Sequence, residues 1–112
     1  MTLDDYQAVA RRTINPALSD SDRLLDAAAG LSEEAGEFLG LVRKRAFQSR
    51  DVSRDKLVEE LGDSLWCLAI AADCLGIRLE DVAVTNVRKL EARHPTGFTN
   101  RQPEDWSRTT RE

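Results

Sequence analysis

The chain has 112 residues, 41% of them hydrophobic, and its 16 basic and 20 acidic residues give a formal net charge of -4. This size and apolar content suit one compact domain, and the sequence has no run of Lys or Arg that would favour a nucleic-acid partner. The first residues lack the apolar core of a signal peptide, and no stretch approaches the roughly 18 apolar residues of a membrane span, so we expect a cytoplasmic protein with no membrane partner.

Apolar residues recur at helical spacing from Leu3 to about Thr13, and the loop around Pro16 ends this first predicted helix. A second helix is expected to follow an N-cap among residues 19–22 and to continue to about Ala46. The polar segment after it breaks the pattern, and Asp51 or Ser53 is the next candidate cap.

A third helix is predicted from about Arg54 to Leu75, with Gly76 placed to end it in the left-handed conformation. Leu79 begins the apolar pattern of a fourth helix, which should stop before Pro95. Residues 99–112 are polar and aperiodic, so we expect a domain at 1–98 and a tail at 99–112. The predicted fold is all-α, a four-helix bundle subunit.

The third predicted helix is apolar on two faces. One face holds Leu57, Val58, Leu61, Leu65, Leu68 and Leu75, and the other holds Trp66, Cys67, Ile70 and Cys74. Both faces need a cover, which favours a homodimer or homotetramer; the alternative is that the other helices of one subunit cover both. A seven-residue separation along a helix is about 10 Å, so the two cysteines should be reduced packing residues.

Acidic residues interrupt the apolar pattern of the second and third helices. Glu34 and Glu37 are three residues apart, as are Glu60 and Asp63, so each pair projects from one side of its helix. Antiparallel packing of the two helices would bring the four carboxylates together, and they would repel one another without a cation. The only histidine is His94, which leaves oxygen ligands and favours magnesium or manganese.

The alternative is that both acidic pairs lie on solvated faces. Gly36 and Gly62 argue against it, because glycine is costly within a helix and its presence beside the acids suggests close backbone approach or room for a ligand. Glu33 points about 100° away from Glu34 and could accept a proton from an attacking water, whereas Glu59 is expected to be a surface residue.

The motif E-E-x-x-E at Glu33, Glu34 and Glu37, followed by E-x-x-D at Glu60 and Asp63, resembles the MazG-like nucleotide pyrophosphohydrolases. The similarity continues through ELGDSLWCLA at 60–69 and TNVRKLEARHPTGF at 85–98. It implies an oligomeric all-α enzyme that hydrolyses (d)NTP to (d)NMP and pyrophosphate with Mg2+. It also implies that Glu34, Glu37, Glu60 and Asp63 are the metal ligands, and that the enzyme removes unwanted nucleotides from the pool.

Asn86, Lys89 and Arg93 should lie along one side of the fourth helix, where an amide and two cations could bind the substrate's phosphates. Alternatively, the two cations pair with surface acids. Trp66 is expected at an interface, although it could stack on a base, and we assign His94 no catalytic role.

Three other functions stay open at this point. Two are enzymatic: a dUTPase-like or dCTPase-like enzyme, and a phosphoribosyl-ATP pyrophosphohydrolase. The third belongs to another class, a noncatalytic helical module that binds a regulatory partner. The response of the melting temperature to Mg2+ or Mn2+ would separate this module from the enzymes, because an ion that binds the folded state must stabilise it.

Overall fold

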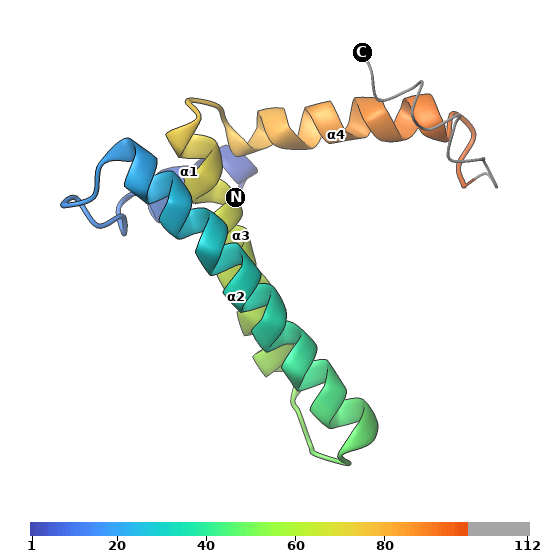
Figure 1. Cartoon of the computed structure of the whole chain (residues 1–112). Helices are drawn as coiled ribbons and strands as arrows, with labels where there is room; N and C mark the ends of the chain where they lie inside the picture. The colour runs from blue at the N-terminus through green and yellow to red at the C-terminus, as the bar shows by residue number, and fades with distance from the viewer. Residues whose placement is uncertain (99–112) are drawn as a thin grey trace. The chain divides into compact units, whose positions relative to one another are not determined.

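The computed structural model describes residues 1–98, which form the helices α1 (Leu3–Arg11), α2 (Asp20–Phe47), α3 (Arg54–Cys74) and α4 (Leu79–Arg93) (Figure 1). Within this range no strand forms, and a single isolated bridge pairs Pro95 with Gly97. The all-α class is therefore confirmed. The expected tail at 99–112 lies outside the described residues. The chain divides into two compact units, Met1–Leu79 and a second that begins at Glu80.

The helix boundaries follow local signals in the sequence. The side chains of Ser19 and Ser53 cap α2 and α3 by accepting a hydrogen bond from the backbone N–H three residues on, at 3.2 Å in each case. Gly76 has a φ of 71°, and the N–H of Ile77 donates to the carbonyl of Ala72 at 3.0 Å. This is the glycine-ended helix terminus predicted for α3.

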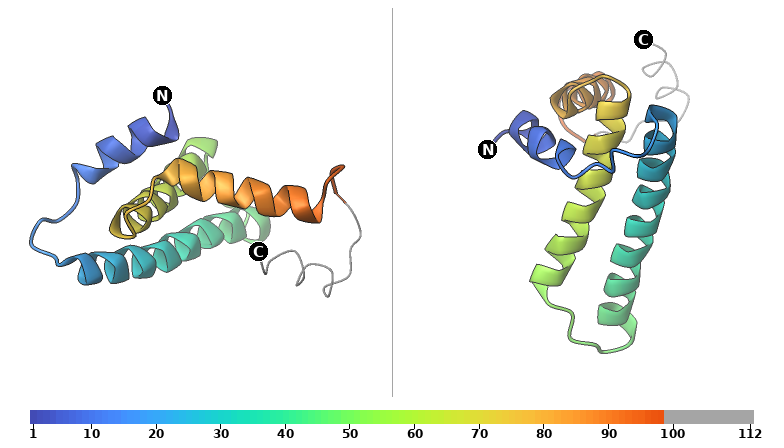
Figure 2. Two further views of the ribbon diagram at one scale, coloured as in Figure 1. Left: turned by 90° about the horizontal axis from the view of Figure 1, so that it is seen from above. Right: turned by 90° about the vertical axis from the view of Figure 1, so that its left-hand side faces the viewer.

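In the first unit, α2 and α3 run antiparallel and side by side, joined by the loop at 48–53 (Figure 2). The core is built largely from small side chains, since Ala27 on α2 and Ala69 and Ala72 on α3 are all at most 3% exposed. Ile70, at 1% exposed, is the largest fully buried side chain of the described residues. Small residues let the two helix backbones approach closely, which brings side chains at the helix edges into contact.

Helix α1 is held to this pair through Gln7, whose side chain is buried. Its Nε2 donates to the carbonyls of Ala69 at 3.3 Å and Ile77 at 3.1 Å, and its Oε1 accepts from the N–H of Leu79 at 2.8 Å. One amide thus satisfies three backbone groups at the end of α3 and the turn after it. An ion pair between Arg11 and Asp73, at 2.7 Å, adds a second link.

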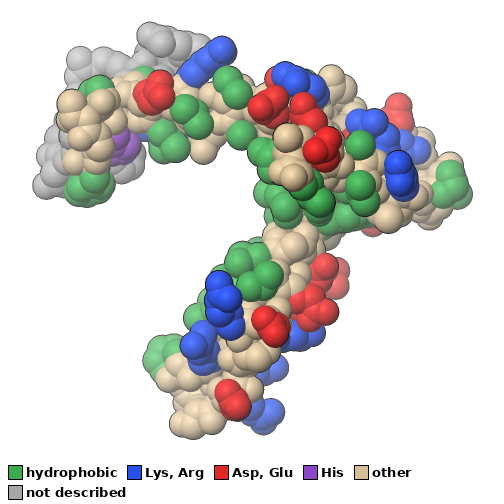
Figure 3. Space-filling model, turned by 180° about the vertical axis from the view of Figure 1, so that it is seen from behind, with side chains coloured by type: hydrophobic (Ala, Val, Ile, Leu, Met, Phe, Trp, Pro, Cys, Tyr) green, Lys and Arg blue, Asp and Glu red, His purple; other side chains and the backbone are tan. Residues whose placement is uncertain are grey.

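The two apolar faces of α3 differ in the structure. Cys67 and Ile70 are buried on the face toward the core, whereas Val58, Leu61 and Leu75 on the other face are 52%, 53% and 62% exposed. Hydrophobic side chains also reach the surface in the space-filling view (Figure 3). The homo-oligomer expected from this face stays a prediction. No helix within residues 1–98 combines the length and apolar character needed to cross a membrane.

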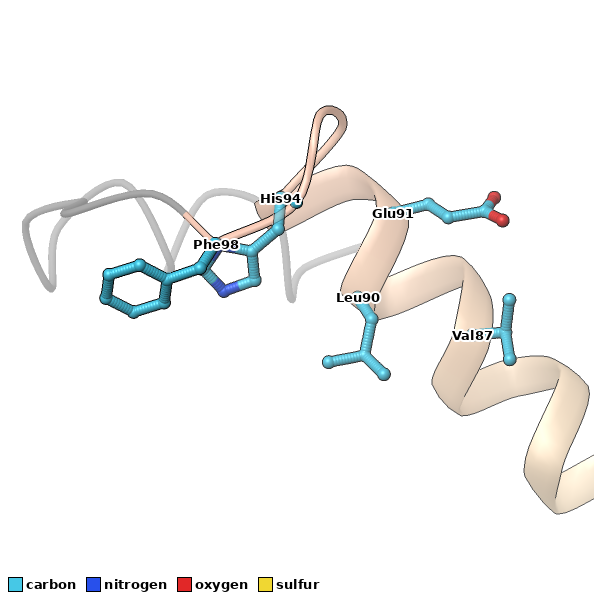
Figure 4. A pocket seen from close by; sticks show the side chains of 6 residues that line it. Val87, Leu90, Glu91, His94 and Phe98 are labelled. Carbon is cyan, nitrogen blue, oxygen red and sulfur yellow. The ribbon is translucent and has the colours of Figure 1, made fainter.

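The second unit contains α4 from Glu80 onward and, among the described residues, the segment at 94–98. Val87, Leu90, His94 and Phe98 line a shallow, mainly apolar groove at the end of the helix (Figure 4). The His94 and Phe98 rings are stacked, with centroids 6.0 Å apart. His94 is therefore a packing partner within this unit.

Candidate metal centre

The candidate centre lies between α2 and α3, about halfway along the antiparallel pair. Glu34 and Glu37 are on α2, and Glu60 is on α3. One carboxylate oxygen from each of these three residues lies within 4.8 Å of the other two. The i, i+3 spacing on α2 and the antiparallel register of α3 produce this grouping, as the sequence predicted for these three residues.

Two oxygen atoms in this cluster are buried and have no hydrogen-bond partner: Oε2 of Glu34 and Oε2 of Glu60. The Glu60 side chain is only 8% exposed. A buried acceptor without a partner is costly, and three converging carboxylates add mutual repulsion. The donor set is hard, anionic and all-oxygen, and therefore fits a divalent cation such as Mg2+ or Mn2+.

The electrostatics of the cluster agree with this geometry. Burial raises the pKa of Glu34 to about 7, helped by a hydrogen bond with Glu60 and by the nearby charges of Glu37 and Asp63. The charge of Glu60 raises the pKa of Glu37, with burial as the next contribution. Without a cation, Glu34 is therefore partly protonated near neutral pH, and a bound cation would displace that proton.

Asp63, the fourth predicted ligand, does not belong to the group of three oxygens within 4.8 Å. It lies close enough for its charge to raise the pKa values of Glu34 and Glu37. It also lines an open cavity of about 270 Å³ next to Glu34. The remaining lining residues of the cavity are Asp26, Gly30, Trp66 and Cys67.

Asp26 and Gly30 were not identified from the sequence, although a signal for them existed. Asp26, Gly30 and Glu34 are spaced i, i+4 and i+8 on α2, which places them on one face of the helix. At Gly30 an added Cβ would lie 3.1 Å from the Sγ of Cys67, so this glycine marks a close approach of α2 to α3. Gly36 and Gly62, by contrast, face open space.

The acidic neighbours of the ligands take different positions. Glu59 is an exposed surface residue, 63% exposed, that pairs with Lys56 at 3.1 Å. Glu33 is also exposed and lies outside the three-carboxylate group, and its charge contributes to the raised pKa of Glu37. The Nζ of Lys56 lies 3.9 Å from Glu60 as well, which places a positive charge at the edge of the cluster.

The predicted phosphate-binding residues lie on α4, in the second unit. Asn86 and Lys89 are exposed and Arg93 is half-buried. Their role toward a substrate stays a prediction. In the first unit, the Nε1 of Trp66 donates to the Oγ1 of Thr13 at 2.7 Å and the indole packs against the core of its own chain.

Both cysteines are free thiols, as expected. Cys67 is buried between α2 and α3 and also lines the cavity beside Glu34, whereas Cys74 is half-buried against the core.

Comparison with known proteins agrees with this arrangement. The MazG nucleotide pyrophosphohydrolase domain matches residues 24–98, a range that includes all the carboxylates described above. The chain is 36% identical over 105 residues to the Gene 37 protein of Mycobacterium phage L5, covering 87% of this chain and 92% of that protein. It is 38% identical over 72 residues to the uncharacterized protein YvdC of Bacillus subtilis strain 168, covering 56% of this chain and 68% of that protein. No solved structure matches the chain.

Proposed function

Because the chain belongs to the MazG nucleotide pyrophosphohydrolase domain family, we propose that it hydrolyses nucleoside triphosphates, ribose or deoxyribose, to the monophosphate and pyrophosphate. The reaction would require Mg2+, with Mn2+ as a possible substitute. The single observation that supports this most strongly is the convergence of Glu34, Glu37 and Glu60 within 4.8 Å. Such an arrangement suits a divalent cation that also binds phosphate oxygens.

In this proposal Glu34, Glu37, Glu60 and Asp63 hold the cation. The bound cation would act as a Lewis acid that offsets the negative charge at the reacting phosphate. Asp63 would complete the ligand set by a side-chain rotation from its place on the cavity wall next to Glu34.

The exposed Glu33 would accept a proton from the attacking water as general base. Asn86, Lys89 and Arg93 would bind phosphate oxygens through one amide and two cationic groups.

The catalytic domain would comprise residues 1–98. The exposed apolar face of α3 would pair with another copy to form a homodimer or homotetramer, since Leu61 and Leu75 are otherwise left 53% and 62% exposed. Removal of noncanonical nucleotides from the pool would be the biological role.

The test is pyrophosphate release from canonical, deoxy and oxidised nucleoside triphosphates, measured with and without Mg2+. The variants are Glu60→Gln, which removes a buried ligand charge, and Glu59→Gln, which removes the adjacent surface charge as a matched control. We expect Mg2+-dependent release from the wild type and Glu59→Gln, and a loss of at least about 100-fold in Glu60→Gln. Release that is independent of Mg2+, or equal in the two variants, would refute the proposal.

A further inference from the structure

The cavity beside Glu34 lies on the side of the cluster that faces the N-terminal half of α2. Asp26 lies at its far end, eight residues before Glu34, a separation of about 12 Å along the helix. Gly30, between them, contributes no side chain to the wall. A nucleotide whose phosphates reach the carboxylate cluster would therefore extend its nucleoside along this wall toward Asp26.

The hydrogen-bonding groups of the cavity are mainly acceptors. Asp26, Glu34 and Asp63 contribute carboxylate oxygens, and the Nε1 donor of Trp66 is already used by Thr13 at 2.7 Å. The Cys67 thiol is a weak donor. Since Glu34 and Asp63 are assigned to the cation, Asp26 is the carboxylate left to contact the far end of a ligand.

We propose, building on the proposed function, that this cavity binds the nucleobase and that Asp26 selects bases presenting an amino group. Guanine fits best, because its adjacent N1–H and N2–H donors can both meet one carboxylate in a bidentate pair. Adenine and cytosine offer one amino group each. Uracil and thymine are disfavoured, because their single N3–H lies between two carbonyl oxygens that a carboxylate repels. The Trp66 ring and the Cys67 thiol supply the apolar part of the wall.

The experiment measures equilibrium binding, so that it does not depend on turnover. The α,β-methylene analogues of dGTP, dATP, dCTP and dUTP are titrated by calorimetry in Mg2+ against the wild type, Asp26→Asn and Asp51→Asn. Asp51 is an exposed loop residue, so the third protein carries the same chemical change away from the cavity. The quantity compared is the ratio of dissociation constants between bases, because removing a negative charge strengthens triphosphate binding in general.

We expect the wild type and Asp51→Asn to bind the dGTP analogue at least about fivefold more tightly than the dUTP analogue. Asp26→Asn should reduce this ratio to less than about twofold, because an amide can also donate to a carbonyl oxygen. Equal binding of all bases by the wild type would overturn the inference. An equal change for all bases in Asp26→Asn would overturn it as well, because Asp26 would then act through its charge or on a part of the nucleotide that all four analogues share.

The failures of the two proposals are distinguishable. If the wild type ranks the bases as expected and Asp26→Asn loses this ranking, but no pyrophosphate is released from dGTP, the hydrolytic function is refuted and the base selection by Asp26 stands. If pyrophosphate is released at the same kcat/KM from dGTP and dUTP and the analogues bind equally, the function stands and the selection is refuted.

Discussion

Replacing the buried Gln7 with leucine should remove the polar link that holds α1 to the end of α3. The amide satisfies the carbonyls of Ala69 and Ile77 and the N–H of Leu79, at 3.3, 3.1 and 2.8 Å. Leucine fills a similar volume but leaves the buried Leu79 N–H and the Ile77 carbonyl without these partners. Each unsatisfied buried group costs about 1–3 kcal/mol, so the free energy of unfolding should fall by about 2–4 kcal/mol.

Urea unfolding followed by circular dichroism, at one fixed protein concentration, measures this loss. The matched control is Arg11→Ala, which removes the other polar link between α1 and α3. The Arg11 side chain is 56% exposed, and an ion pair of this kind contributes less than about 1 kcal/mol. Equal losses in Gln7→Leu and Arg11→Ala would show that the buried amide does not fix α1, and would refute the reasoning.

Three other predictions concern side chains of α2 and α3 in the first unit. The pKa of Glu34 is raised from the usual 4.5 to about 7 in the folded protein. The protonated Glu34 carboxyl therefore adds fully to the free energy of unfolding below pH 4.5, and this addition is lost as the pH rises from 4.5 to about 7. In EDTA, the melting temperature should therefore fall between pH 5 and pH 8 in the wild type and fall less in Glu34→Gln; equal falls would contradict the assignment. Gly30→Val should cost about 1–3 kcal/mol in urea unfolding, because even a Cβ there lies 3.1 Å from the Sγ of Cys67. Adding Cys67→Ala should recover part of that loss. If the changes in the free energy of unfolding caused by the two substitutions are strictly additive, residue 30 does not contact Cys67. Trp66→Phe should lower the free energy of unfolding by about 1 kcal/mol in the same assay, because it removes the 2.7 Å hydrogen bond to Thr13. An unchanged free energy of unfolding would show that this hydrogen bond does not form in solution.

Local sequence signals predicted the helices well. Each boundary depends on residues within a few positions of it, such as the serine caps Ser19 and Ser53 and the left-handed Gly76, which act through the adjacent backbone. The grouping of Glu34, Glu37 and Glu60 was predictable for a similar reason. Helical spacing fixes the side of each helix, and a short loop at 48–53 makes the two helices antiparallel neighbours.

Features that depend on contacts between distant segments were not predictable. The amide of Gln7 meets groups 62 to 72 residues later in the chain, and no local pattern identifies such partners. The sequence suggested close backbone approach or room for a ligand at Gly36 and Gly62; both face open space, and the close approach of the two helices is at Gly30. Which glycine meets a neighbouring helix depends on the rotation of each helix about its axis, and this is set by packing of the small core residues.

Thermal unfolding of the metal-free protein across a Mg2+ titration tests most directly whether the carboxylates form a native cation site. At 100 times the dissociation constant, an ion that binds only the folded state adds about 2.7 kcal/mol, enough to raise the melting temperature by several degrees. We expect this rise in the wild type and in Glu59→Gln, and its loss in Glu60→Gln. A melting temperature that does not respond to Mg2+ or Mn2+ in the wild type, or that rises equally in all three proteins, would contradict it.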